Sequence, residues 1–94
     1  MFERGEFRIK GFVKQVEKIK ENLVLVTLTW HDKELIFTDE ISKEDYYDSE
    51  HFYEHLDIGD CVIVEGVDVI RPIENCKGMY GHIFKIHSIF ICMD

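Results

Sequence analysis

The segment that most constrains the fold of this chain is residues 56–66, whose sequence is LDIGDCVIVEG. Gly59 and Asp60 are typical turn residues, and an alternating apolar stretch follows them up to a second glycine, Gly66. A turn that leads directly into such a stretch is typical of a chain that re-enters a sheet. Together with the apolar runs before and after it, this segment predicts a small curved β-barrel of five strands, with one helix after the third strand.

Chain length and composition favour one folded domain. A chain of 94 residues buries only about two thirds of its unfolded surface and has no material for a second core. Apolar residues make up 46% of the sequence, and seven Phe, four Tyr and one Trp supply bulk for a small core. We therefore expect residues 1–94 to form a single ordered domain.

The net charge of -8 is distributed unevenly along the sequence. Residues 1–20 carry six basic and three acidic side chains, residues 21–60 carry two basic and twelve acidic ones, and residues 61–94 have a net charge of -1. This distribution excludes a uniformly basic nucleic-acid-binding surface. We expect positive charge on one face of the barrel and negative charge on the opposite side.

Cysteine content and hydropathy indicate a cytoplasmic protein. Cys61, Cys76 and Cys92 form no Cys-x-x-Cys pair and are odd in number, which fits thiols in a reducing compartment. The N-terminal residues lack the apolar core of a signal peptide, and no apolar run approaches the ~20 residues of a membrane span. We expect no contact with a membrane.

Period-2 alternation predicts the five strands. They are expected at residues 7–14, 23–30, 34–41, 61–70 and 82–93, with a helix within 43–56. The residues expected to face inward are Phe7, Ile9, Gly11, Val13, Val24, Val26, Leu28, Leu35, Phe37, Val62, Val64, Phe84, Ile86, Phe90 and Cys92. Ile36 competes with Leu35 and Phe37 for the inward positions. Trp30 is in phase with the buried residues of its strand, and both burial and exposure at the strand end remain open.

A basic stripe with one aromatic ring occupies the expected outer face of the first strand. The outward residues are Arg8, Lys10, Phe12 and Lys14, followed in the next connection by Lys18 and Lys20. Lys and Arg neutralise phosphates, and an exposed aromatic ring stacks on a base with about 1–3 kcal/mol per base. The stripe therefore predicts binding of single-stranded nucleic acid. Ordinary solvation of an outer strand face is the alternative interpretation.

The connection at residues 71–81 is a second candidate for ligand contact. It is longer than an ordinary hairpin loop, and long connections often carry function. It adds Arg71, Lys77 and Tyr80 to the candidate nucleic-acid-binding residues.

Catalytic motifs are not found in the sequence. No Ser or Cys lies in a nucleophile motif, and no glycine-rich phosphate loop is present. Glu44 and Asp45 are adjacent in sequence, which gives no specific support for an acid–base pair. We therefore expect no catalytic residue, no cofactor and no enzymatic activity.

Two histidines raise the alternative of a metal site. His51 and His55 are four residues apart on the expected helix, with Glu54 and Asp48 nearby, and this spacing can direct both rings at one ion. Two ligands alone are weak evidence, and nothing in the sequence places Cys76 beside them. Solvated histidines on an acidic helix are the favoured interpretation, so no metal site is predicted.

The arrangement resembles the oligonucleotide/oligosaccharide-binding fold, the OB-fold. The resemblance rests on the glycine-broken first strand at residues 7–13, the hairpin at residues 23–41 and residues 56–66, and it covers nearly the whole chain. It implies an all-β, five-stranded barrel in the order β-β-β-α-β-β. The fold is shared by single-strand DNA binders, by tRNA anticodon-binding domains and by modules that bind only proteins.

The resemblance also implies where a ligand would bind. The groove would cross the second and third strands, at Thr27, Thr29 and Thr38. It would be flanked by two connections, which carry Lys18 and Lys20 and Arg71, Lys77 and Tyr80. We expect a non-catalytic module that binds single-stranded nucleic acid weakly and with little sequence preference. The alternative is an acidic protein-interaction module that binds no nucleic acid, either in a replication or repair assembly or as a nucleic-acid mimic, and that docks a basic protein.

Overall fold

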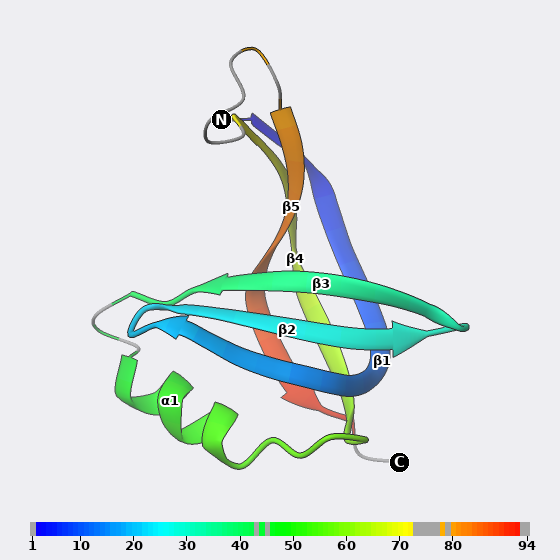
Figure 1. The fold of residues 1–94 in the computed structure, drawn as a ribbon, viewed down its shortest axis with the longest axis vertical. Helices are drawn as coiled ribbons and strands as arrows, with labels where there is room; N and C mark the ends of the chain where they lie inside the picture. Colours follow the sequence, from blue (N-terminus) through cyan, green and yellow to red (C-terminus); the bar gives the residue numbers. More distant parts are fainter. Residues whose placement is uncertain (1, 43, 45, 73–77, 79, 93–94) are drawn as a thin grey trace.

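The computed structural model of the protein describes residues 2–42, 44, 46–72, 78 and 80–92. Its elements are β1 (Phe2–Lys20), β2 (Leu23–Trp30), β3 (Lys33–Glu40), α1 (Tyr46–Glu54), β4 (Cys61–Pro72) and β5 (Tyr80–Ile91). The strands close into a barrel in the order β1-β2-β3-β5-β4, and α1 lies at one end of it (Figure 1). Neighbouring strands are antiparallel except β3 and β5. The predicted all-β barrel with a helix between the third and fourth strands is confirmed.

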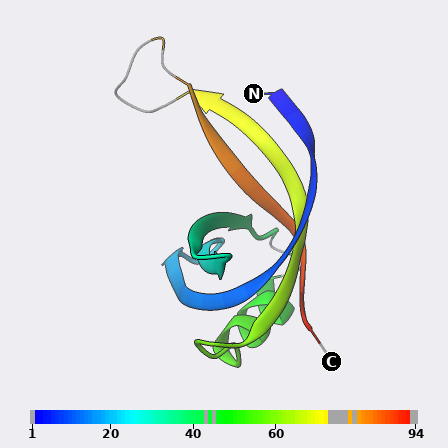
Figure 2. The same cartoon turned by 90° about the vertical axis from the view of Figure 1, so that its right-hand side faces the viewer.

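The long first strand takes part in both halves of the barrel. β1 pairs with β4 over residues 2–12 and with β2 over residues 12–20, and it curves strongly between them (Figure 2). Gly11 lies next to Phe12, where β1 changes its partner strand. It is buried and packs so closely on β2 that an added Cβ would lie 3.0 Å from the backbone oxygen of Thr29. Its predicted inward position is confirmed.

β1 is longer than the strand predicted at residues 7–14. The register with β2 shifts between Val13 and Gln15, so Lys14 is the extra residue of a β-bulge. Val16 then packs against the core although it is three residues from Val13. The bulge breaks the simple alternation, and the strand continues to Lys20.

The core consists of alternating residues from all five strands. Val26, Leu28, Phe37, Val62 and Val64 are 0% exposed. Phe37 also contacts Phe7 on β1 and Phe84 on β5, with ring centroids 5.4–5.9 Å apart within this group of three. The inward residues predicted for the first four strands are all buried or packed against this core.

The fifth strand departs from prediction near its end. Phe90 is 38% exposed, and Ile89 packs against the core in its place. The cause is a register shift between β4 and β5 at Glu65 and Gly66, which reverses the alternation after Ile86. Gly66 permits this close crossing, because an added Cβ would lie 1.9 Å from the backbone oxygen of Lys85.

The helix lies within its predicted range and is held by side-chain contacts. Phe52 and Tyr53 pack against the core, and the Tyr53 hydroxyl donates a hydrogen bond of 2.5 Å to Asp39 Oδ2 on β3. Burial, and then the Asp39 carboxylate, raise the pKa of Tyr53 above its ordinary value. A helix of nine residues is not stable alone in water, so these contacts fix α1 on the barrel. Within the described residues, no helix combines the length and apolar character needed to cross a membrane.

The turn predicted at Gly59 and Asp60 joins the helix connection to β1. The Gly59 amide donates to the Val13 carbonyl at 2.7 Å, and the Val13 amide donates to the Asp60 carbonyl at 2.9 Å. Within the turn, the Asp57 amide donates to Asp60 Oδ2 at 2.9 Å. These bonds position the start of β4 beside the middle of β1.

Candidate nucleic-acid interface

The outer face of β1 carries four of the predicted nucleic-acid-binding residues, all of them exposed: Arg8, Lys10, Phe12 and Lys14. Arg8 and Lys10 lie in the half of β1 that pairs with β4, opposite Glu65 and Ile63. Lys14 lies in the bulge, in the half of β1 that pairs with β2. The curvature of β1 therefore distributes these residues along one bent surface.

Phe12 occupies the junction between the two halves of the barrel. It is opposite Cys61 on β4 and opposite Thr29 on β2, and its side chain is 55% exposed. Thr29 Oγ1 also donates to the Phe12 carbonyl at 3.4 Å. The aromatic ring therefore lies where the outer face of β1 continues onto β2.

The outer side of β2 and β3 completes this surface. Thr27 is opposite Ile36, and Thr29 is opposite Glu34. Ile36 is 56% exposed because its two neighbours, Leu35 and Phe37, take the inward positions. We call this surface the β1–β3 face, and its members are Phe12, Lys14, Thr27, Thr29, Glu34 and Ile36.

An ion pair crosses the β1–β3 face. Lys14 Nζ contacts Glu34 Oε1, and both side chains are 52% exposed. Because Thr29 on β2 separates β1 from Glu34 on β3, the Lys14 side chain extends over β2. An exposed pair of this kind contributes only about 0–1 kcal/mol, so a phosphate can replace the Glu34 carboxylate at small cost.

Trp30 lies at the tip of the β2–β3 hairpin, which extends past β1 (Figure 1). Its side chain is 44% exposed and its ring contacts His31, with centroids 4.3 Å apart. The residue remains in phase with Leu28, on the side of β2 opposite Thr29. Trp30 is therefore exposed but is not part of the β1–β3 face.

Two predicted residues lie at the far end of β1. Lys18 and Lys20 are exposed and are opposite Val24 and Leu23. Lys18 borders an apolar cleft of about 460 Å³, which also has Val24 and Leu56 in its wall. This cleft lies between the barrel end and α1, so the structure separates Lys18 from Phe12.

The three candidate binding residues of the fourth connection do not add to the β1–β3 face as the structure describes it. Arg71 lies on β4 with its side chain 26% exposed, and it forms an ion pair with Glu40. Tyr80 begins β5 opposite Pro72, but its side chain lies outside the described part of the chain. Lys77 also lies outside the described residues.

An acidic cleft is present on another side of the barrel. It has a volume of about 690 Å³ and is formed by the end of β3, α1 and β5. Asp39, Glu40 and Asp48 lie in its wall, with Lys85 and His87 from β5. Three carboxylates repel phosphate, so this cleft does not suit a nucleic acid.

Comparison with solved structures decides the fold family. A chain of the S. pombe Stn1–Ten1 complex aligns with 95% of this chain at a TM-score of 0.68 and 18% identity. Rim1, a mitochondrial single-stranded DNA binding protein from S. cerevisiae, aligns with 92% of it at a TM-score of 0.60 and 14% identity. This chain has the OB-fold. No family model matches the sequence, and no curated protein matches it.

The OB-fold predicted by resemblance is therefore confirmed, and it accounts for nearly the whole chain. The alignment covers 90% of the Rim1 chain but 59% of the chain from the Stn1–Ten1 complex, so this domain spans about three fifths of that chain's length. At identities of 14% and 18%, the likeness establishes the fold and not the ligand. The β1–β3 face contains Thr27 and Thr29, two of the three groove positions that the resemblance implied. Thr38, the third, lies farther along β3, opposite Leu25.

Proposed function

We propose that this OB-fold domain binds single-stranded nucleic acid, weakly and with little sequence preference, through the β1–β3 face together with Arg8 and Lys10. The observation that carries the proposal is the 55% exposure of Phe12 on a sheet face that also presents cations. A half-exposed ring beside Lys and Arg combines stacking with phosphate contact, which is the usual mode of single-strand binders. We propose binding alone, without catalysis.

The spacing of the residues supports this chemistry. Lys10 lies two positions before Phe12, or about 7 Å along the strand, and Lys14 lies in the bulge that follows Phe12. A base stacked on the Phe12 ring would therefore have cations on both sides for its own phosphate and the next one. The Thr27 hydroxyl can donate and accept hydrogen bonds, and the Thr29 hydroxyl, which donates to the Phe12 carbonyl, can still accept one. Such hydroxyls suit several base edges and favour low sequence preference.

The structural neighbours support the class of ligand. Rim1 is described as a single-stranded DNA binding protein, and it shares the fold over 92% of this chain. The Stn1–Ten1 structure is that of a protein complex, which supports a protein partner in addition. We therefore place single-stranded DNA first among the nucleic acids to test.

Fluorescence anisotropy of a labelled oligothymidylate, measured at low and at moderate salt, tests the proposal. Phe12→Ala should weaken binding about 5- to 150-fold, because one stacked base contributes about 1–3 kcal/mol. Phe90→Ala is the matched control, since Phe90 is an exposed ring on β5 that lies outside the β1–β3 face and is separated from Lys10 by Ile63 on β4. It should leave the affinity unchanged.

Charge reversal provides an independent measurement. The double variant Lys10→Glu and Lys14→Glu should weaken binding and flatten its dependence on salt, because fewer counterions are released from the nucleic acid. Affinity that is unchanged in both Phe12→Ala and the charge variant would refute the proposal. Equal loss in Phe90→Ala would also count against it, because the effect would then not be specific to this face.

The second candidate function is protein interaction without nucleic-acid binding. Exposed apolar side chains outside the β1–β3 face favour it, since Ile58 is 78% exposed and Ile91 at the end of β5 is 46% exposed. The excess of acidic residues in the segment 21–60 suits a basic partner. Two results together would favour this function over the first. The wild-type protein would show no oligonucleotide binding at low salt, and it would form a stoichiometric complex with a purified basic protein.

A further inference from the structure

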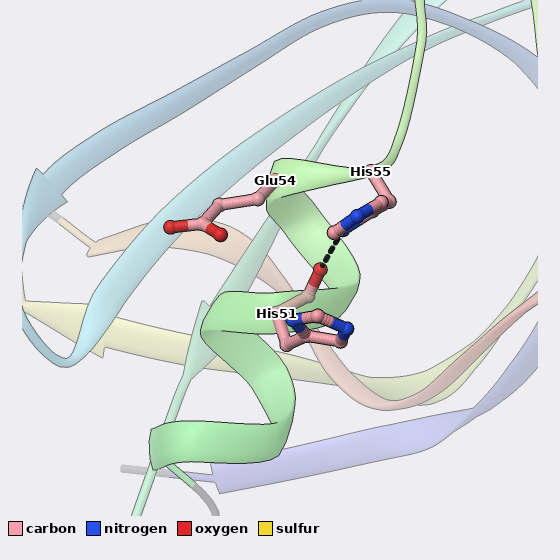
Figure 3. Close-up of side chains that lie close together, drawn as sticks. All are labelled: His51, Glu54 and His55. Carbon is pink, nitrogen blue, oxygen red and sulfur yellow. Dashed lines mark hydrogen bonds between the residues drawn. The ribbon is translucent and has the colours of Figure 1, made fainter.

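The helix α1 brings together three side chains that are typical metal ligands. His51, Glu54 and His55 are exposed, and one ligand atom of each lies within 4.8 Å of the others. Figure 3 shows the two imidazole rings on successive turns of the helix, and their centroids are 4.5 Å apart. The sequence placed Glu54 near the two histidines and favoured solvated side chains, and the structure brings a carboxylate oxygen of Glu54 within 4.8 Å of a ring nitrogen of both.

The orientation of His55 suits metal binding. Its Nδ1 lies 2.9 Å from the His51 carbonyl oxygen (Figure 3). A carbonyl oxygen only accepts hydrogen bonds, so Nδ1 carries the proton and donates it. In the neutral ring, Nε2 then holds the lone pair that a metal ion needs, and the backbone bond fixes the direction of the ring.

The distances are compatible with tetrahedral coordination. Zn²⁺ binds His nitrogen and carboxylate oxygen at about 2.0–2.2 Å, which places neighbouring ligand atoms about 3.4 Å apart. In the structure one ligand atom of each residue, either ring nitrogen counting for a histidine, lies within 4.8 Å of the others. The exposed side chains of His51 and Glu54 can bring their ligand atoms toward His55 Nε2 by rotation. We propose that α1 binds one Zn²⁺ through His51 and His55, with Glu54 as the third ligand and water as the fourth.

The surroundings of the site favour a cation of this class. The ligands lie in the last turn of α1 and directly after it, where the helix carbonyls carry partial negative charge. Asp48, one turn before His51, adds a negative side chain. Two imidazoles with one carboxylate suit Zn²⁺, whereas Mg²⁺ and Ca²⁺ prefer oxygen ligands alone. A bound ion would link residues 51 and 55 and stabilise a helix that is too short to be stable alone.

Isothermal titration of the tag-free protein with ZnCl₂ tests the proposal, with MgCl₂ as the comparison ion. We expect one Zn²⁺ per chain and no Mg²⁺ binding. His51→Gln and His55→Gln should each weaken Zn²⁺ binding by at least about 10-fold, and Glu54→Gln by less. His87→Gln is the matched control, because His87 is an exposed histidine on β5, and it should bind Zn²⁺ like the wild type.

Thermal unfolding supplies a second readout. Zn²⁺ at one fixed concentration that saturates the wild type should raise the Tm of the wild type and of His87→Gln by several degrees, and should raise the Tm of His51→Gln by clearly less. The proposal is wrong if the wild type shows no saturable Zn²⁺ binding, or if His51→Gln binds as tightly as His87→Gln. Because these residues lie outside the β1–β3 face, the result is independent of whether the oligonucleotide binds.

Discussion

Replacing Tyr53 with Phe measures how firmly α1 is held on the barrel. The Phe ring keeps the contacts with Phe52 and the core, but the hydrogen bond of 2.5 Å to Asp39 Oδ2 is lost. A hydrogen bond to a charged group contributes about 1.5–3 kcal/mol, and the partial exposure of Tyr53 lowers that figure. Tyr53→Phe should therefore reduce the free energy of unfolding by about 1–2 kcal/mol, which corresponds to a fall in Tm of about 4–16 °C.

The same variant predicts a change in pH dependence. Burial, and then the Asp39 carboxylate, raise the pKa of Tyr53 in the folded protein. The unfolded chain releases the phenol proton near pH 10, where the folded chain still holds it, so the stabilising contribution is complete below about pH 10 and is lost above it. The difference in unfolding free energy between wild type and Tyr53→Phe should be constant from about pH 7 to pH 9. It should narrow above about pH 10, by up to 1.4 kcal/mol per pH unit.

Urea unfolding followed by circular dichroism measures both effects. The midpoint should fall with no change in the m-value, because the surface exposed on unfolding is unchanged. A double-mutant cycle with Asp39→Ala, which removes the acceptor, should give a coupling energy of about 1–2 kcal/mol. A wild-type midpoint in Tyr53→Phe, or a coupling energy near zero, would show that this hydrogen bond does not hold the helix.

Two further predictions concern the barrel and its outer face. Gly66→Ala should destabilise the protein by about 1–3 kcal/mol or more in thermal melts, because its Cβ would lie 1.9 Å from the Lys85 oxygen. Gly5→Ala is the control, since nothing lies within 4 Å of its added Cβ, and its Tm should stay near that of the wild type. Glu34→Gln should tighten oligonucleotide binding by up to about fivefold, because it removes a carboxylate from the proposed interface and releases its lysine. Asp48→Asn removes the same charge from α1 and should change the affinity little at moderate salt.

The sequence predicted the barrel because alternation is a local property. Inward positions for Phe7 and Ile9 required Arg8, Lys10 and Phe12 to point outward, and the structure exposes all three outward residues. The same reasoning, carried one step further, would have placed Ile36 outside, since Leu35 and Phe37 were already assigned to the core. The exposure of Ile36 on the β1–β3 face could therefore have been predicted from the sequence.

The bulges were not predictable, because they depend on how two strands pair. The shift at Lys14 extends β1, and the shift opposite Gly66 turns Phe90 outward. Gly66 is the one local signal of the second shift, because a glycine inside a strand is typical of a bend or bulge, but a glycine alone does not give the direction of the bend. The ion pair between Lys14 and Glu34 connects β1 and β3 across β2, which lies between them. It therefore depends on the strand order and could not be predicted from local sequence.

Net charge is a poor guide to what the β1–β3 face can bind. Charges are screened within about 8 Å at physiological salt. Glu34 and Glu40 are six residues apart on β3, or about 20 Å, and Asp48 lies by the cleft at the Glu40 end. The acids of α1 therefore act weakly on a phosphate near Phe12, even though the chain carries a charge of -8. Glu34 contacts Lys14 within the β1–β3 face, so in the proposed interface this one carboxylate should limit the affinity more than the overall charge does.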